Sequence, residues 1–371
     1  MKIAILGTKG IPNRYGGYEQ FAEYLSARLV KSGHSVTVYN PHDHPFDQDT
    51  FQGVTIIRKY CPETLIGASA HFLYDFLCLW DALKRDFDIV YEAGYHSAAP
   101  SLALLIGKKM KSPVVLTNMD GLEWRRSKWN RVTQEVIKRL EVMAVRNSPF
   151  LIADNLGIQQ YLFEKHRAKS IYLSYGAEPA YTFDPSGLAE YNVQPERYLM
   201  LVTRVEPENN LEAILKGFLA SKPDIPLLFV GNTRNRFGQF LMARYQSPLI
   251  KYVGTIFDKP LLDALRHFSL AYFHGHSVGG TNPSLLEAMA CGSFIIAHDN
   301  SFNRHVLNEN ALYFNGENDL AQLLPKVSEL KRARRNFGTN NQAEIKREYD
   351  WEIITQRHIQ LFERLLSRNA T

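Results

Sequence analysis

The sequence predicts an α/β protein made of two doubly wound, Rossmann-like domains. The chain opens with a strand, a helix and a second strand, and another series of strands and helices begins near residue 199. Its 371 residues are too many for one hydrophobic core and suit two domains. Because strands alternate with helices, each half is expected to form a parallel sheet covered by helices.

The first half begins with an apolar segment at residues 2–6 that predicts a buried strand. From Tyr18 onward apolar residues recur at helical spacing until Gly33 ends the helix, and residues 35–39 form the next strand. Further strands are expected at residues 54–57, 89–91, 114–117 and 151–153. These elements place a first domain at residues 1–174.

The second half repeats the alternation of strands and helices. Its strands are expected at residues 199–202, 227–230, 250–253, 270–273 and 294–297, with helices between them, for instance at 211–219 and 261–268. This places a second domain at residues 175–350, followed by a C-terminal helix at 351–371 that packs back on the first domain. Ligands of such sheets bind beyond the carboxyl ends of the strands, so the glycine-rich loops of both halves are expected to meet in a cleft.

The composition indicates a folded globular protein, with 45% hydrophobic and 22% charged residues. The three cysteines lie far apart without a CxxC spacing, which indicates neither a disulfide framework nor a zinc site. The chain starts directly in a strand, and its apolar stretches are too short to cross a bilayer. We therefore expect a cytoplasmic protein that sits on the inner face of the cell membrane without crossing it.

Positive charge is concentrated in two segments, although the net charge is only +5. The first holds Lys108, Lys109 and Lys111, and the second holds Glu123, Trp124, Arg125, Arg126, Lys128 and Trp129. Bases interleaved with aromatic residues suit an anionic surface, and a solvated helix face is an equally weighted alternative. Because no nucleic-acid module signature accompanies these segments, we favour a lipid surface over nucleic acid.

The segment of residues 274–292 predicts an anion-binding site. A glycine-rich loop at 279–282 separates a predicted strand from a helix that begins near Ser284. The first backbone N–H groups of a helix lack internal acceptors, and the helix dipole favours negative charge there. Taken alone, the segment fits an ordinary strand-to-helix turn equally well.

The loop after the first strand also ends in glycines, Gly16 and Gly17. Its glycines do not fit the G-x-G-x-x-G dinucleotide fingerprint. Two glycines directly before a helix can nevertheless bring backbone amides close to a diphosphate. A flexible surface loop is the alternative.

Arg204 follows the predicted strand at residues 199–202. A guanidinium at the carboxyl end of such a strand can hold phosphate oxygens in a bidentate manner. In isolation, Arg204 could instead pair with a surface carboxylate such as Glu206 or Glu208.

Arg204, the glycine loop and Glu287 in LLEAMACG together resemble the C-terminal domain of retaining GT-B glycosyltransferases of the GT4 family. The segments GTKGIPNRYGGYEQF and NMDGLEWRRSKW resemble a bacterial subgroup with an N-terminal domain of the DUF1972 type, which includes rhamnosyltransferases of surface-polysaccharide synthesis. The resemblance covers nearly the whole chain. It implies the GT-B fold, in which two Rossmann-like domains face each other across a cleft.

The resemblance also implies a donor site. Glu287 would hydrogen-bond the ribose hydroxyls of the nucleotide, and Arg204 would hold the diphosphate. The amides that would cradle the sugar and the diphosphate belong to Gly16, Gly17, Gly279, Gly280, Thr281 and Asn282.

Two further residues are implied to contact the transferred sugar and the acceptor. His96 and Asp120 follow strands of the first domain, and with Arg204 they form the predicted catalytic set. His96 could instead be a structural histidine. Asp120 could instead cap a tryptophan-rich helix.

Two positions depart from the family pattern. Gly279 stands where many relatives carry the first of two glutamates, and Asn209 stands where many carry a lysine. Losing a carboxylate and an ammonium together changes the charge of a site less than losing either alone. This favours a retuned donor pocket that includes Asn209, although an inactive relative would show similar gaps.

The resemblance therefore implies a retaining transfer of L-rhamnose from dTDP-L-rhamnose, favoured over UDP- and GDP-sugars, to a lipid-diphosphate-linked saccharide. In this family the departing phosphate takes the acceptor proton, so no strong protein base is required. No Asp-x-Asp motif follows a predicted strand, and neither a metal nor a cofactor is expected. The alternatives are a sugar-nucleotide epimerase of the same fold and a catalytically silent nucleotide-sugar-binding protein.

Overall fold

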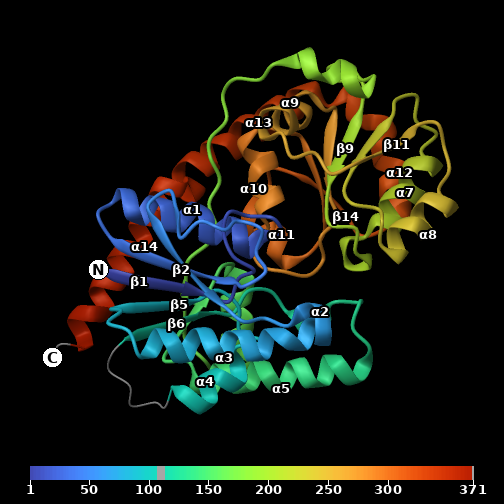
Figure 1. Cartoon of the computed structure of the whole chain (residues 1–371). Coiled ribbons are helices and arrows are strands. Elements are labelled where there is room, and N and C mark those ends of the chain that lie inside the picture. Colours follow the sequence, from blue (N-terminus) through green and yellow to red (C-terminus); the bar gives the residue numbers. More distant parts are fainter. Residues whose placement is uncertain (107–112, 370–371) are drawn as a thin grey trace. The chain divides into compact units, whose positions relative to one another are not determined.

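The computed structural model describes residues 1–106 and 113–369, so Lys108, Lys109 and Lys111 lie outside the described residues. The chain divides into two compact units, drawn in Figure 1. Unit 1 contains Met1–Arg125, Trp129–Tyr175 and Trp351–Thr371, and unit 2 contains Arg126–Lys128 and Gly176–Asp350. Each unit holds one sheet.

Unit 1 is organised around an eight-stranded sheet with the order β3-β4-β2-β1-β5-β6-β7-β8. All neighbouring strands pair in parallel except β3, which runs antiparallel to β4. The strands are β1 Lys2–Leu6, β2 Ser35–Pro41, β3 Thr50–Phe51, β4 Val54–Lys59, β5 Ile89–Glu92, β6 Val114–Asn118, β7 Phe150–Ala153 and β8 Ser170–Tyr172. The six predicted strands are confirmed, and the two that were not predicted, β3 and β8, are edge strands of two and three residues.

Helices cover both faces of this sheet. They are α1 Gly17–Lys31, α2 Glu63–Ile66, α3 Ala70–Leu83, α4 Ala99–Leu105, α5 Arg131–Asn147, α6 Leu156–His166 and α14 Trp351–Asn369. Figure 1 shows α3, α4 and α5 together on one face, with α1 and α14 on the other. The C-terminal helix α14 packs on α1 through Trp351, whose ring stacks on Tyr24 and lies 6.2 Å from the ring of Phe21.

Unit 2 holds a fully parallel six-stranded sheet with the order β11-β10-β9-β12-β13-β14. Its strands are β9 Leu199–Val202, β10 Leu227–Val230, β11 Ile250–Gly254, β12 Ala271–His274, β13 Ile295–His298 and β14 Leu312–Phe314. The five predicted strands are confirmed. The missed strand, β14, is a three-residue edge strand, too short for a periodic signal.

The helices of unit 2 include both that the sequence predicts at 211–219 and 261–268. They are α7 Leu211–Ala220, α8 Arg236–Arg244, α9 Lys259–Phe268, α10 Pro283–Ala290, α11 Ser301–Leu307, α12 Glu317–Leu323 and α13 Lys331–Glu344. The buried core contains β9, β10 and α7, with Phe218 and Phe229 fully enclosed. Both units are therefore α/β layers around a parallel sheet, as predicted.

Among the described residues, no helix combines the length and the apolar character that crossing a bilayer requires.

Candidate functional site

The two loops that carry the predicted donor residues leave adjacent strands of unit 2. Strands β9 and β12 pair in parallel at the centre of the sheet, so both of their carboxyl ends lie at one edge. The chain leaves β9 into residues 203–210 and leaves β12 into residues 275–282. The structure therefore brings Arg204 and the glycine loop to one place, where ligands of such sheets bind.

Two consecutive asparagines, Asn209 and Asn210, hold these two loops in place. The side-chain amide of Asn209 donates to the hydroxyl of Thr203 at 3.0 Å and to the carbonyl of Arg204 at 2.8 Å. The next residue, Asn210, donates to the carbonyl of Gly275 at 2.8 Å. Asn209 is buried, so its amide N–H groups hold the backbone that presents Arg204. The donor contact predicted for Asn209 stays a prediction.

Glu208 also links the two loops by hydrogen bonds. The backbone N–H and the hydroxyl of Ser277 both donate to the carbonyl of Glu208, at 3.2 and 2.7 Å. The buried carboxylate of Glu208 accepts from the Arg126 guanidinium at 3.3 Å and from the Ser127 hydroxyl at 3.2 Å. These bonds fix the spacing of the two loops before any ligand arrives.

The guanidinium of Arg204 is exposed. In the part of the chain that the structure describes, it has no ion-pair partner, and Glu208 binds Arg126 instead. The alternative pairing of Arg204 with Glu206 or Glu208 is therefore not what the structure contains. A cation held at the edge of the sheet without a counter-charge is suited to an anionic ligand.

Helix α10 begins at Pro283, one residue before the predicted start, and Asn282 caps it. The side-chain amide oxygen Oδ1 of Asn282 accepts from the backbone N–H of Ser284 at 3.0 Å and from its hydroxyl at 2.8 Å. The preceding loop needs glycine at Gly279, because its φ is +135°. A Cβ there would meet no atom within 4 Å, so backbone conformation and not space disfavours the glutamate of the relatives.

Glu287 lies on α10 and is held by a buried arginine. Arg266, on α9, donates from one guanidinium nitrogen to Glu287 at 2.5 Å and from another to Asp263 at 2.9 Å. Burial opposes the charged form of Arg266, but its neighbours, Glu287 first among them, raise the pKa of the guanidinium above its ordinary value. The side chain of Glu287 keeps 20% of its surface exposed, so its carboxylate is both oriented and accessible.

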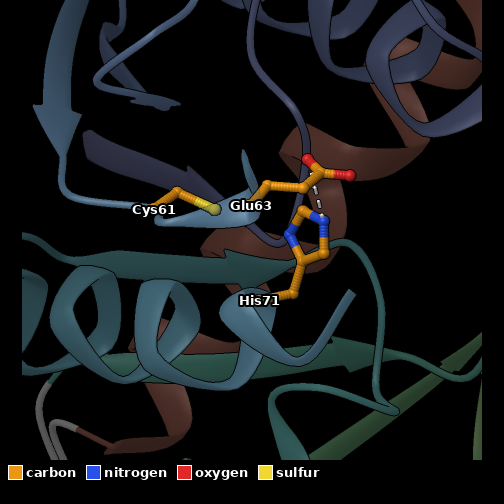
Figure 2. A group of neighbouring side chains, drawn as sticks. All are labelled: Cys61, Glu63 and His71. Atoms are coloured by element: carbon orange, nitrogen blue, oxygen red, sulfur yellow. Dashed lines mark ion pairs between the residues drawn. The ribbon is translucent and has the colours of Figure 1, made fainter. Parts of the chain in front are cut away.

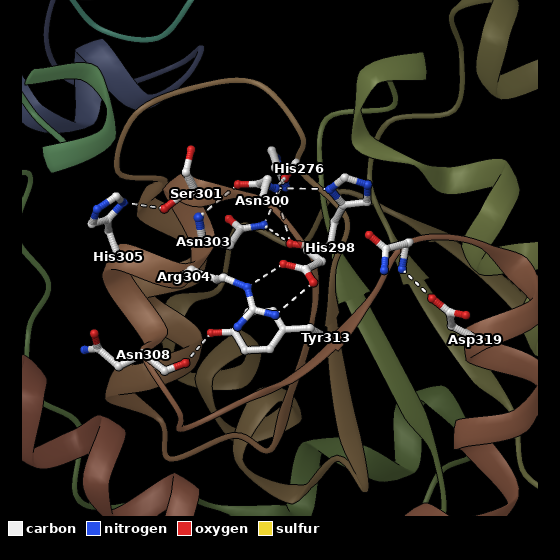
Figure 3. Close-up of polar contacts among 12 residues, drawn as sticks. His276, His298, Asn300, Ser301, Asn303, Arg304, His305, Asn308, Tyr313 and Asp319 are labelled. Carbon is white, nitrogen blue, oxygen red and sulfur yellow. Dashed lines mark hydrogen bonds and ion pairs between the residues drawn. The ribbon is translucent and has the colours of Figure 1, made fainter. Parts of the chain in front are cut away.

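A histidine cluster adjoins these loops, and sequence reasoning missed it. The rings of His274 and His276 stack with centroids 4.4 Å apart. The side-chain amides of Asn300 and Asn303 both donate to the carbonyl of His276 at 3.0 Å and also to the carbonyl of His298 (Figure 3). The sequence signal was the pattern His-Gly-His at the end of a predicted strand.

The neutral state of His274 gives a prediction for acid stability. Burial, and then His298, lower the pKa of His274 to about 3. The unfolded chain binds a proton near pH 6.5 and the folded chain does not, so stability falls as the pH drops from 6.5 toward 3. Between pH 7 and pH 5 this one group should cost about 2 kcal/mol of folding free energy.

The substitution His274→Phe tests this expectation. It removes the proton site and keeps an aromatic ring, so the stability of unit 2 should fall less between pH 7 and pH 5 than in wild type. All four tryptophans belong to unit 1, so tryptophan fluorescence follows the urea unfolding of unit 1, and the change in circular dichroism that does not coincide with it follows unit 2. The control His305→Asn, on α11, should keep the wild-type slope. An unchanged slope in His274→Phe would contradict the assignment.

In unit 1, Gly16 and Gly17 form the start of α1. Gly16 occupies the N-cap position and Gly17 is the first helical residue. The loop before them is fastened by Glu19 of α1, which accepts from the backbone N–H of Lys9 at 2.8 Å. A Cβ on Gly7 would come within 1.9 Å of the buried Glu92 carboxylate, so this loop follows a tightly packed path. The diphosphate contact of the two glycines stays a prediction.

Asp120 does not cap a helix. Its carboxylate accepts from the Tyr18 hydroxyl at 2.7 Å, and its own backbone N–H donates to Asn118 at 3.0 Å. Asp120 is half-buried and has a φ of +39°, a conformation uncommon outside glycine. Burial, and then Asp120, raise the pKa of Tyr18 well above its ordinary value. Tyr18 therefore orients this carboxylate, and no pattern in the sequence indicates the pair.

His96 is half-buried in the turn that follows β5. Its ring meets the ring of Tyr95 edge to face, with centroids 6.0 Å apart. Its contact with the transferred sugar stays a prediction.

The segment Trp124–Trp129 is not a helix with one solvated face. Glu123–Arg125 is a short 3₁₀ turn, and helix α5 starts only at Arg131, capped by Asn130. Both tryptophans are half-buried: Trp129 donates to Glu123 at 3.1 Å, and Trp124 lies under the ammonium of Lys138.

The basic residues of this segment have different surroundings. Arg125 and Lys128 are exposed, whereas the Arg126 side chain is only 13% exposed because it binds Glu208. Arg126 therefore does not present its charge to a surface as the sequence predicted. A guanidinium paired with a buried carboxylate has a structural role instead.

Figure 2 shows another polar cluster in unit 1, formed by Cys61, Glu63 and His71. One potential ligand atom from each lies within 4.8 Å of the others. The Glu63 carboxylate, however, already binds the Lys9 ammonium at 2.7 Å and His71 at 3.4 Å. Burial raises the pKa of the Cys61 thiol to about 11. The contacts are those of an ion-pair network, and we assign no metal to it.

Both halves of the chain match known protein families. Residues 1–178 match the model described as "Domain of unknown function (DUF1972)", and residues 189–344 match "Glycosyl transferases group 1". An uncharacterised glycosyltransferase of Methanocaldococcus jannaschii is 26% identical over 181 residues, covering 46% of this chain and 45% of that protein. The chain thus spans about half the length of this curated relative.

Solved structures of the same fold cover nearly the whole chain. Sucrose-phosphate synthase from Thermosynechococcus elongatus has a TM-score of 0.83 at 18% identity, with 99% of each chain covered. The Anabaena protein HepE in complex with UDP and glucose has a TM-score of 0.74 at 15% identity, with 98% of this chain and 99% of that chain covered. The chain therefore has the two-domain GT-B fold, and its residues 189–344 match the family model of group 1 glycosyl transferases.

Proposed function

We propose that this protein is a retaining glycosyltransferase that uses a nucleotide-diphosphate sugar. One observation in unit 2 carries the proposal: an exposed Arg204 without an ion-pair partner among the described residues lies at the same sheet edge as the capped N-terminus of α10. The guanidinium and the helix amides suit a diphosphate. Glu287, on the same helix and oriented by Arg266, suits the ribose hydroxyls.

In the proposed reaction the bond between the anomeric carbon and the diphosphate oxygen breaks. A bond from that carbon to an acceptor hydroxyl oxygen forms on the same face, and the hydroxyl proton passes to the departing diphosphate. Arg204 and the α10 amides stabilise the charge that develops on the diphosphate, so the proposal requires no metal. Asp120, held by Tyr18, orients the acceptor hydroxyl.

For the donor we propose L-rhamnose carried by dTDP. The resemblance of GTKGIPNRYGGYEQF and NMDGLEWRRSKW to rhamnosyltransferases supports this choice. The open space around Gly279, where relatives carry a carboxylate, is consistent with a donor pocket changed to suit another sugar. The solved Anabaena relative binds UDP and glucose, which supports a nucleotide-sugar donor in general.

For the acceptor we propose a lipid-diphosphate-linked saccharide at the inner face of the cell membrane. Exposed apolar side chains on consecutive helices of unit 1 support contact with lipid. They are Leu65 and Ile66 on α2, Phe72, Leu73 and Trp80 on α3, and Leu104 on α4. The exposed bases Arg125 and Lys128 would add attraction to anionic headgroups.

A thermal-shift screen of nucleoside diphosphates tests the donor. A ligand that binds only the folded state at 100 times its Kd adds about 2.7 kcal/mol of stability, which should raise the melting temperature by roughly 5 °C. We expect dTDP to give a larger shift than UDP or GDP at equal concentration. A larger shift with UDP or GDP would refute the dTDP assignment, and no shift with any of them would refute the proposed function.

Release of dTDP from dTDP-rhamnose on addition of a GlcNAc-diphospho-lipid then tests the transfer itself. Formation of an epimer without acceptor would instead identify an epimerase. Tight nucleotide binding without turnover on any acceptor would identify a silent binding protein.

A further inference from the structure

We propose that His276 contacts the diphosphate of the donor and takes up a proton when that diphosphate binds. The inference rests on the proposed function and adds a residue that neither the family resemblance nor the sequence pattern assigns. His276 is the second residue after β12, in the loop that leads to the N-terminus of α10. It thus lies in the same loop as the glycines of the predicted donor site.

Hydrogen bonds hold the backbone of His276 in place, but a buried nitrogen of its imidazole makes none to the described residues. Its backbone is held by Asn300 and Asn303, whose amides converge on its carbonyl (Figure 3). Its ring stacks on His274, but its Nδ1 is buried and has no hydrogen-bond partner among the described residues. Native structures leave few buried polar atoms unpaired, and such an atom in a ligand loop points to an absent partner.

His274 provides an independent observation of the same kind. This residue is 1% exposed, and neither of its ring nitrogens has a partner in the part of the chain that the structure describes. Two stacked imidazoles with three unpaired nitrogens cost folding free energy that a merely structural pair would avoid. Because His276 is less buried than His274, it is the one that a ligand can reach.

Burial and the neighbouring groups keep His276 neutral before the donor binds. His274 faces it from β12, Arg204 from the loop after β9, and Arg126 from beside Glu208. Burial lowers the pKa of His276 well below its ordinary value, and these three groups lower it further. The carboxylate of Glu208 is paired with Arg126, and His298 acts on His274.

A bound diphosphate raises the pKa of His276 again, because it adds negative charge beside the imidazole. It brings about two negative charges to the edge that Arg204 marks, and a nearby opposite charge favours the protonated imidazole. The proton comes from solvent, and Nδ1 or Nε2 of His276 then donates to a phosphate oxygen. This supplies a cation where Asn209 replaces the lysine of many relatives. During transfer the same hydrogen bond strengthens as charge collects on the departing diphosphate.

Isothermal titration calorimetry tests the proposal with UDP and dTDP as ligands. Titrations at pH 7 in buffers of different ionisation enthalpy count the protons taken up on binding. The terminal phosphate of the ligand also titrates near pH 6, so His276→Asn serves as the reference that shares this contribution. Wild type should take up roughly half a proton more than His276→Asn, and the variant should bind about tenfold more weakly.

Two further variants separate this role from a structural one. His276→Gln should resemble His276→Asn, and both should melt no lower than wild type without ligand, because the lost imidazole nitrogen is unpaired. His305→Asn, on α11 outside the cluster, should keep wild-type affinity and proton uptake. Equal proton uptake, or equal affinity, in wild type and His276→Asn would overturn the inference while leaving the proposed function intact. Failure of wild type to bind any nucleoside diphosphate would overturn both.

Discussion

Replacing Arg204 with alanine should lower the rate of sugar transfer by about two to three orders of magnitude. Removal of one preorganised group that stabilises developing charge typically costs this much in turnover. The melting temperature should stay unchanged, because the guanidinium is exposed and no described residue forms an ion pair with it. The measurement is the initial rate of nucleoside diphosphate release with saturating donor and acceptor, together with a thermal melt.

The matched control is Arg332→Ala, which removes an exposed arginine from α13 of the same unit. It should keep both the wild-type rate and the wild-type melting temperature. Arg204→Lys should recover part of the lost activity, because an ammonium keeps the charge but cannot form the bidentate contact. A rate within threefold of wild type in Arg204→Ala would remove Arg204 from the proposed mechanism.

The fold was predictable because local sequence patterns predict most strands of both sheets. Short segments rich in apolar residues predicted eleven strands, all present in the structure, and the three missed strands, β3, β8 and β14, are short edge strands. Such strands are formed by pairing with a neighbour, and their own two or three side chains carry no period. The C-terminal helix α14 belongs to unit 1. It is held there by aromatic contacts, such as that of Trp351 with Phe21, between residues that lie far apart in the sequence.

The candidate site was predictable only where a residue has a fixed place next to a strand or a helix. Arg204 follows β9 and Asn282 precedes α10, so their positions follow from those elements. The partners of the site come from far along the chain: Tyr18 binds Asp120 across 102 positions, and Arg126 binds Glu208 across 82. No spacing rule indicates such pairs.

The clearest case is Arg266, which gave no signal in the sequence. In isolation, an arginine near the C-terminus of a helix is expected to be a solvated cation that favours the helix dipole. In the structure it is 1% exposed and binds two carboxylates. Its side chain connects α9 to Glu287, so the predicted ribose contact depends on a residue that motif reasoning cannot find.

Replacing Arg266 with methionine should therefore destabilise unit 2 by about 3–5 kcal/mol. Breaking a buried ion pair from one side leaves its partner charge uncompensated. Asp263 still contacts Lys259, but Glu287 loses its guanidinium partner. The loss should appear as a lower urea midpoint by circular dichroism, while tryptophan fluorescence reports unit 1 alone.

The surface pair of Arg304 with Asp299 is the matched comparison, because both of its side chains are more than a quarter exposed. Arg304→Met should lower the stability of unit 2 far less than Arg266→Met does, because solvent screens an exposed ion pair. If Arg266→Met lowers the free energy of unfolding no more than Arg304→Met does, the buried ion pair is not what stabilises the contact between α9 and α10.

Arg266→Met also gives a prediction for nucleotide binding. At a temperature where the variant remains folded, its affinity for UDP and dTDP should still fall about tenfold, because Glu287 without its orienting partner Arg266 holds the ribose hydroxyls less well. Loss of stability with full nucleotide affinity would show that Arg266 supports the fold without supporting Glu287.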